Sequence, residues 1–299
     1  MGSIKYFNSF LLLLFLYAQI GMSAILNAQV VLDGSLGIKG SISGPDYAIT
    51  ADLGLQQGNN LFHSFNTFDI NTLETAIFSG PNSISNIISR VTDGKTSFID
   101  GKIQSTITDA NFYFLNPGGI MFGPNASLDV TGSFHASAGD YLLFTDNSFF
   151  YADPAKVSIL TIAPPAAFGL LSDNPATLTA SGSLLSVPKG EYISLSGGNI
   201  TLDNTNLFAQ SGHISLAAPG GTVTINRTKT PPNYDSNMMV ADLEAGGMEN
   251  GYDGGSISIV AGQLKMTNAS IRTDTYSATG SDGILFNVDK DINISGGFI

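Results

Sequence analysis

The chain has 299 residues, 12% of them charged and 43% hydrophobic, with a formal net charge of −12 and no cysteine. Its 12 Lys and Arg residues form no cluster, so nucleic acid is excluded as a partner, and an exported form of the chain has no disulfides. The 34 glycines, with many Ser, Thr and Asn residues and no runs of helix formers, favour short strands joined by tight turns. We therefore expect an all-β protein.

Residues 1–28 predict a signal peptide. Lys5 precedes a short apolar run from Phe10 to Ile20, and small residues follow that run, so cleavage after Ala24 or Ala28 fits. The alternative is a membrane anchor, but a spanning helix needs about 20 apolar residues. No later segment is apolar enough to span a membrane, so we expect a soluble mature product.

Residues 29–75 contain short apolar units, such as Val30 to Leu32, interrupted by Gly and Pro. If the later repeats stack as a solenoid, the first coil exposes an apolar cross-section and unpaired strand edges, which require a cap. We expect a short antiparallel cap in this region. The segment from Ile84 to Val91 fits either a helical turn or a strand.

The sequence Asn116-Pro117-Gly118-Gly119-Ile120 predicts a tight corner. Pro117 fixes φ at the second position of a turn, and Asn116 at the first position can bond its own backbone two residues on. Gly118 and Gly119 permit positive φ, and Ile120 restarts a strand that faces inward. Two interpretations stay open: a corner needed for folding, or a direct contact with a partner.

Proline and glycine residues at Ala163 to Ala166 and at Leu170 to Pro175 interrupt the strand pattern. We place a boundary near residue 165, which divides the mature chain into residues 29–165 and 166–299.

The C-terminal half contains repeated units in which two apolar residues flank one other residue. The units are spaced by seven residues within two runs, and they begin at Ile193, Ile200, Leu207, Ile214, then at Ile257, Leu264 and Ile271. A coiled coil also repeats every seven residues, but the period of two within each unit indicates a strand. Three strands and three turns make about 21 residues, one coil of a parallel β-solenoid. About 270 mature residues then give roughly a dozen coils stacked at ~4.8 Å.

Thr228 to Gly255 carries Pro-Pro and scattered charges, and it predicts a loop excursion at about 228–255. The last residues, Asn293 to Ile299, lie inside another strand unit. An uncapped strand edge is an aggregation hazard, so we expect the chain to be either a truncated gene product or a fragment of a longer exoprotein.

Two stretches, Asn60 to Ile70 and Ala110 to Leu143, resemble the N-terminal secretion domain of filamentous haemagglutinin-type exoproteins, also called the haemagglutination activity domain. That family has the motif Asn-Pro-Asn-Gly-Ile, which corresponds to Asn116–Ile120 with Gly118 in place of the second Asn. Its second motif, Asn-Pro-Asn-Leu, has its nearest counterpart at Gly80 to Ser83, which keeps only Pro81 and Asn82.

The resemblance implies a right-handed parallel β-helix with an N-terminal cap and extra-helical β elements. It implies a bacterial exoprotein that the general export machinery delivers to the periplasm. There the POTRA domains of an outer-membrane β-barrel transporter bind it, and the chain then crosses the outer membrane unfolded. The residues implied in recognition are Asn116, Pro117, Gly118, Gly119 and Ile120 and, more weakly, Pro81 and Asn82. The exported protein would serve attachment, with host or cell-surface glycans as candidate partners.

Two alternatives stay open: the N-terminal part of a contact-dependent inhibition toxin, or a carbohydrate-active β-helix lyase or hydrolase. The sequence distance from Asp109 to Asp129 is close to the length of one coil, so the two could stack as a carboxylate pair, although solvated turn aspartates are the simpler interpretation. His63, His135 and His213 share no metal-ligand spacing. We therefore predict no enzyme activity, no cofactor and no metal.

Overall fold

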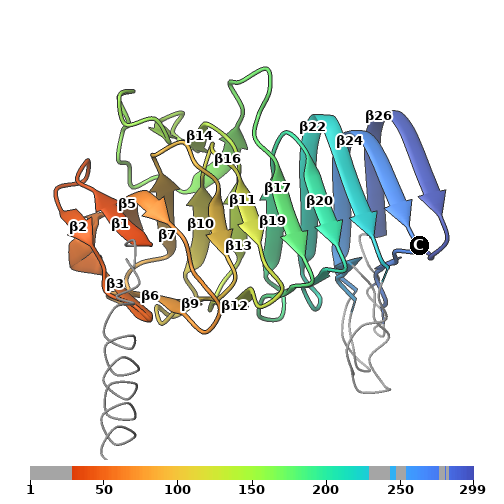
Figure 1. The fold of residues 1–299 in the computed structure, drawn as a ribbon, viewed down its shortest axis with the longest axis horizontal. Coiled ribbons are helices and arrows are strands. Elements are labelled where there is room, and N and C mark those ends of the chain that lie inside the picture. The colour runs from red at the N-terminus through yellow and green to blue at the C-terminus, as the bar shows by residue number, and fades with distance from the viewer. Residues whose placement is uncertain (1–28, 229–242, 247–253, 276–279, 281–282) are drawn as a thin grey trace, which may run out of the picture.

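The computed structural model describes residues 29–228, 243–246, 254–275, 280 and 283–299. The predicted signal peptide and most of the predicted loop excursion therefore lie outside the described residues. Within them the chain forms a parallel β-solenoid with three faces, whose strands stack along one long axis (Figure 1). The prediction of an all-β parallel β-helix is confirmed.

The first face is a parallel stack in which each strand pairs with the next coil. Its strands are β5 (Asn60–Phe68), β7 (Asn86–Val91), β10 (Asn111–Leu115), β13 (Phe134–Ser137), β19 (Tyr192–Ser196) and the first parts of β22 (His213–Asn226), β24 (Ser256–Thr267) and β26 (Gly283–Ser295). The three last strands bend partway along their length and continue onto the second face. The first and second faces therefore share one continuous set of strands at the C-terminal end.

The second face contains β8 (Ser97–Ile99), β11 (Ile120–Phe122), β17 (Leu178–Ser181), β20 (Ile200–Asp203) and the second parts of β22, β24 and β26. The third face begins with β3 (Asp46–Thr50), β6 (Thr75–Ser79), β9 (Lys102–Ser105) and β12 (Ser127–Asp129), and ends with β18 (Leu184–Ser186), β21 (Asn206–Phe208), β23 (Leu243–Glu244) and β25 (Ile271–Arg272). β23 falls inside the segment predicted as an excursion, yet it pairs with β21 as an ordinary solenoid strand.

The seven-residue units are strands whose apolar residues point into the solenoid. Ile193 and Ile214 are both fully buried, and they pair across neighbouring coils in the register that the sequence spacing predicts. Inward aliphatic and aromatic side chains of successive coils form one cluster from Val30 to Ile271. Burial of this much apolar surface is the main stabilising contribution, at roughly 25 cal/mol per Å².

The prediction of a dozen coils is wrong, since eight strands stack on the first face in the described part of the chain. The N-terminal coils are longer than the C-terminal ones on which the estimate was based: Asn60 pairs with Asn86, and Asn86 pairs with Asn111. A larger insertion separates Phe134 from its partner Ile193. Long turns and this insertion use residues that the estimate had assigned to coils.

The expected antiparallel cap is present at the N-terminal end. β1 (Val30–Asp33) pairs antiparallel with β2 (Lys39–Ser41) and with β5, and β4 (Leu55–Gln57) also pairs antiparallel with β5. These strands cover the first coil, whose edge would otherwise be open. A single 3₁₀ turn, Ala51–Leu53, connects β3 to β4.

The insertion between β13 and β17 is a three-stranded antiparallel sheet, which we call the antiparallel extension. It consists of β14 (Tyr141–Phe144), β15 (Phe149–Tyr151) and β16 (Pro165–Gly169), and it lies beside the solenoid (Figure 1). The boundary predicted near residue 165 falls at the start of β16, while the main core continues on both sides. That boundary stays a prediction.

The antiparallel extension covers the outer side of the N-terminal strands of the first face and forms a second core there. Phe62 and Ile88 of the solenoid pack with Leu142, Phe144 and Phe150 of the extension. The ring centroids of Phe62 and Phe150 are 5.1 Å apart. All six residues of β7 are buried as a result, which explains why the segment around it shows no alternating pattern in the sequence.

Candidate functional site

The segment Asn116–Ile120 forms the corner where β10 of the first face leads to β11 of the second. The N–H of Gly119 donates to the carbonyl of Asn116 at 3.0 Å, which closes a tight turn. Oδ1 of Asn116 accepts a hydrogen bond from the N–H of Gly118 at 2.8 Å. The predicted bond from Asn116 to its own backbone is therefore confirmed.

The side chain of Asn116 also joins this corner to the preceding coil. Its Nδ2 donates to the carbonyl of Lys95 and to the hydroxyl of Ser97, each at 2.9 Å. Its backbone N–H donates to the carbonyl of Ser137 in the next coil. Asn116 is fully buried, and both polar atoms of its side-chain amide have partners, so one residue fixes the stacking of three coils.

Gly118 and Gly119 have different roles in the corner. Gly119 has φ +104°, a region that favours glycine, whereas Gly118 is not in the positive-φ region. A Cβ on Gly118 would instead lie 2.4 Å from the carbonyl oxygen of Lys95. The family's second Asn therefore has no room here, because the turn of the preceding coil occupies the space.

In the folded chain, little of this corner is accessible to a partner. Pro117 and Gly118 are partly exposed, while Asn116, Gly119 and Ile120 are buried. Ile120 points into the core and pairs with strands on both sides. In the folded protein the corner is therefore mainly a structural element, and only Pro117 and Gly118 reach the surface.

The weaker motif lies in a different environment. Pro81 and Asn82 are both exposed in the turn between β6 and β7. The N–H of Ile84 donates to the carbonyl of Pro81 at 3.1 Å. The turn holds its shape through this backbone bond, and the Asn82 side chain faces solvent.

A second corner, which the sequence reasoning missed, joins the second face to the third. Asp100 accepts hydrogen bonds from the N–H and the Nδ2 of Asn125 at 2.9 and 3.0 Å, and another from the hydroxyl of Thr72. Burial by itself raises the pKa of Asp100, but these hydrogen bonds outweigh it and hold the pKa below its usual value. The tripeptide Gly-Pro-Asn occurs at residues 80–82 and again at Gly123 to Asn125. This repetition is the sequence signal that could have identified the second corner.

Neither carboxylates nor histidines assemble into a catalytic group in the part of the chain that the structure describes. Asp129 lies opposite Gln104, which donates to it at 2.8 Å, rather than stacking on Asp109. His63 is fully buried on β5, and burial lowers its pKa to about 4. His135 stacks on a tyrosine ring, and His213 bonds the hydroxyls of two serines. Among the described residues, no three potential metal ligands lie together.

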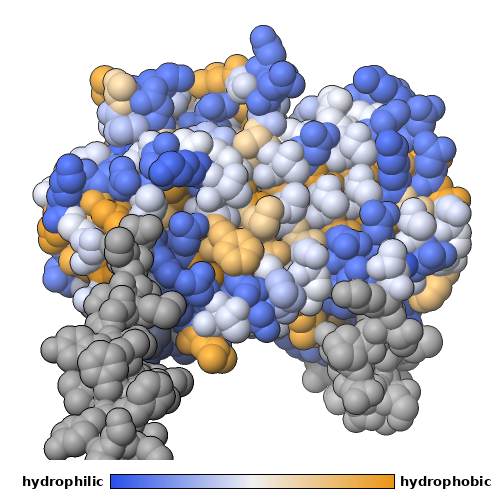
Figure 2. Space-filling view, viewed as in Figure 1, coloured by the Kyte–Doolittle hydropathy of each residue, from blue (hydrophilic) through white to orange (hydrophobic). Residues whose placement is uncertain are grey.

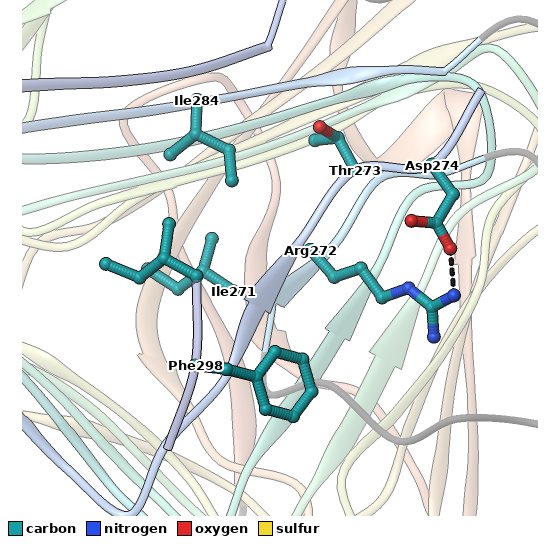
Figure 3. A pocket seen from close by; sticks show the side chains of 7 residues that line it. Ile271, Arg272, Thr273, Asp274, Ile284 and Phe298 are labelled. Atoms are coloured by element: carbon teal, nitrogen blue, oxygen red, sulfur yellow. Dashed lines mark ion pairs between the residues drawn. The ribbon is translucent and has the colours of Figure 1, made fainter. Parts of the chain in front are cut away.

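An open pocket lies at the C-terminal end of the solenoid (Figure 3). Its apolar wall comes from Ile271, Ile284 and Phe298, and its polar side is the ion pair of Arg272 with Asp274. Because the Asp274 carboxylate forms an ion pair with the Arg272 guanidinium, the two charges on the polar side of the pocket neutralise each other.

The comparison with protein families gives one clear result. The model of the TPS secretion domain matches residues 28–270, which include the cap, the corner at Asn116–Ile120 and the antiparallel extension. The chain therefore belongs to the TPS, or two-partner secretion, domain family.

It is the N-terminal secretion domain of a haemagglutinin-type exoprotein, a substrate of two-partner secretion that is secreted with the help of an outer-membrane transporter. The family is a secretion family and not an enzyme family. A comparison with curated proteins gives no match. Within the described residues, no helix has the length and apolar character to cross a membrane.

Proposed function

We propose that the transporter recognises this chain through its POTRA domains at the segment containing Asn116–Ile120, and that the exported protein serves attachment to surfaces. The observation that carries the proposal is the family match over residues 28–270, within which this corner is the segment most similar to the family's secretion motif. The exposed turn at Pro81 and Asn82 is a second, weaker contact.

Burial of the corner bears on when recognition takes place. The amide of Asn116 is enclosed once the coils stack, and its partners are Lys95, Ser97 and Gly118. Before folding, the same amide is free to bind another polypeptide. We therefore place recognition in the periplasm, on the unfolded chain, and assign the corner a structural role after export.

The test follows secretion in cells that carry the transporter. Asn116→Asp and Pro117→Ala are expected to leave synthesis and passage to the periplasm intact but to prevent appearance in the medium. Asn204→Asp is the matched control, because the side-chain amide of Asn204 also bonds the turn of a neighbouring coil, at Thr228, and this variant should be secreted normally. Normal secretion of both motif variants would contradict the motif assignment.

A binding measurement separates recognition from folding. Purified POTRA domains are titrated with the chain at a urea concentration that unfolds the chain but leaves the POTRA domains folded. Under these conditions the folded corner contributes nothing to binding. If Asn116→Asp weakens this binding, the side chain is read directly. Equal binding of the variant and the native chain would mean that the residue acts only in folding.

A further inference from the structure

Five residues form a straight row on the outside of the second face, which we call the outer strip. They occupy equivalent outward positions on five consecutive strands, from β8 through β11, β17 and β20 to β22, and they are Phe98, Met121, Thr179, Thr201 and Thr224. Neighbouring strands are about 4.8 Å apart, so the row is roughly 20 Å long.

The outer strip is uncovered in the described part of the chain. The antiparallel extension packs on the N-terminal strands of the first face, while Phe98 is 38% and Met121 is 43% exposed on the second. Figure 2 shows an apolar patch in the region of β11 and a surface of intermediate hydropathy toward β17 and β20. Two adjacent large apolar side chains beside a row of hydroxyls form a patch with a defined chemistry.

This chemistry matches a sugar ring. A pyranose has a face of C–H groups, which packs on an aromatic ring or a thioether, and a rim of hydroxyls, which bond to other hydroxyls. The hydroxyl of Thr179 is shielded and has no hydrogen-bond partner, although it lies between Met121 and Thr201 in the row. A sugar hydroxyl that reaches the row beside Met121 can supply that partner.

The charge of the protein distinguishes between acidic and neutral polysaccharides as ligands. The five side chains of the outer strip are uncharged, the row continues on β24 with the single cation Lys265, and the whole chain carries a formal net charge of −12. An acidic polysaccharide would be repelled by this net charge. A neutral polysaccharide has no such cost, and a linear one can follow the row from strand to strand.

We propose that the outer strip binds a neutral polysaccharide chain along the second face. This inference rests on the proposed function, because it names the surface and the ligand class for attachment. The strip exists only when five coils are stacked, so the exported, folded protein binds the glycan and the unfolded chain does not. The surface is separate from the buried corner at Asn116.

The test is affinity electrophoresis of the purified full chain in gels that contain dextran, mixed-linkage β-glucan, galactomannan or, for comparison, alginate. We expect retardation in at least one neutral gel and none in alginate. Phe98→Ser with Met121→Ser should weaken binding about tenfold or more, the loss that truncation of an aromatic anchor produces. Both residues are partly exposed, so thermal denaturation should show a folded variant.

Tyr192→Ser with Leu285→Ser is the matched control, because these side chains are 48% and 63% exposed on the first face, and it should bind like the native chain. Retardation only in alginate, no retardation in any neutral gel, or unchanged binding of the Phe98 and Met121 variant would overturn the proposal. The assay uses purified protein, so its failure leaves the secretion results untouched, and a failure of secretion leaves this binding result untouched.

Discussion

The guanidinium carbon of Arg90 lies 4.6 Å from the centroid of the Phe150 ring, although the two residues belong to different parts of the fold, β7 and β15. Arg90 is 3% exposed. It donates to the hydroxyls of Ser64 and Ser35 at 2.7 and 2.8 Å and to the carbonyl of Tyr151. One cation thus connects the cap, the first coils and the antiparallel extension.

Replacing this cation should destabilise the whole N-terminal half. We expect Arg90→Met to lower the free energy of unfolding by about 3–5 kcal/mol, because it removes the donors of a buried network that also contains Asp33. Urea denaturation followed by circular dichroism measures this change. Lys95→Met is the control, since the Lys95 side chain is 81% exposed, and its effect should stay within about 0.5 kcal/mol. Equal midpoints for both variants would contradict the role of Arg90.

Asn60 holds the antiparallel extension in place, and this contact can be tested alone. Its Nδ2 donates to the carbonyls of Thr161 and Ala163 at 2.9 and 2.7 Å. Asn60→Asp keeps the size of the side chain but places a carboxylate against two carbonyls, at a cost of about 1–3 kcal/mol.

We expect this variant to expose the segment around residues 153–163 to limited proteolysis while the C-terminal coils stay protected. The control is Asn82→Asp, whose side chain is exposed. A cleavage pattern like that of the native chain would show that other contacts hold the extension.

At the corner formed by Asn116–Ile120, we expect the residue of the family motif to be destabilising. Gly118→Asn restores the residue of the family motif, but its Cβ would lie 2.4 Å from the Lys95 carbonyl. We expect a loss of about 1–3 kcal/mol, the usual cost of overpacking. Gly94→Asn is the control, because Gly94 has φ +74° with open space around its Cβ, and asparagine tolerates that conformation. Equal stability of the two variants in thermal denaturation would refute the steric explanation.

Because His63 is buried, we expect the protein to lose stability in mild acid. Burial lowers the pKa of His63 from 6.5 to about 4. Above pH 6.5 the ring is neutral in both states. As the pH falls from 6.5 toward 4, the unfolded chain binds a proton that the folded chain does not, so the free energy of unfolding decreases by about 3 kcal/mol in total.

His63→Phe should flatten this part of the pH profile, measured by urea denaturation at steps between pH 7 and pH 4. Burial lowers the pKa of His135 in the same direction, so the variant keeps part of the slope. A slope identical to that of the native chain would exclude His63 as its source.

The C-terminal coils could be predicted from the sequence because each strand there has one buried side. Ile193 and Ile214 alternate with polar neighbours, so the period of two and the spacing of seven are both visible. Around Ile88 the same logic fails, since the antiparallel extension buries the outer side as well. Sequence alone gives no sign that Phe150, far along the chain, covers this strand.

The corner was predicted in part. The bond between Asn116 and Gly118 follows from local chain geometry, which a motif of five residues contains. The bonds from Asn116 to Lys95 and Ser97 depend on how coils stack, and that register is set by turns of variable length. The crowding at Gly118 is of the same kind, because it comes from the neighbouring coil.

The position of the antiparallel extension in the chain divides folding into nucleation and elongation. Phe62 and Asn60 find their partners only when the residues up to Ala163 are present, so the first stable unit is a nucleus that closes long loops and forms slowly. The coil from Ile193 to Ile214 pairs over a short stretch of chain and the coil from Ile214 to Ile257 over a longer one, but each adds to an existing edge. A chain that emerges N-terminus first therefore meets the slow nucleation step at the beginning, and later coils then extend an edge that already exists.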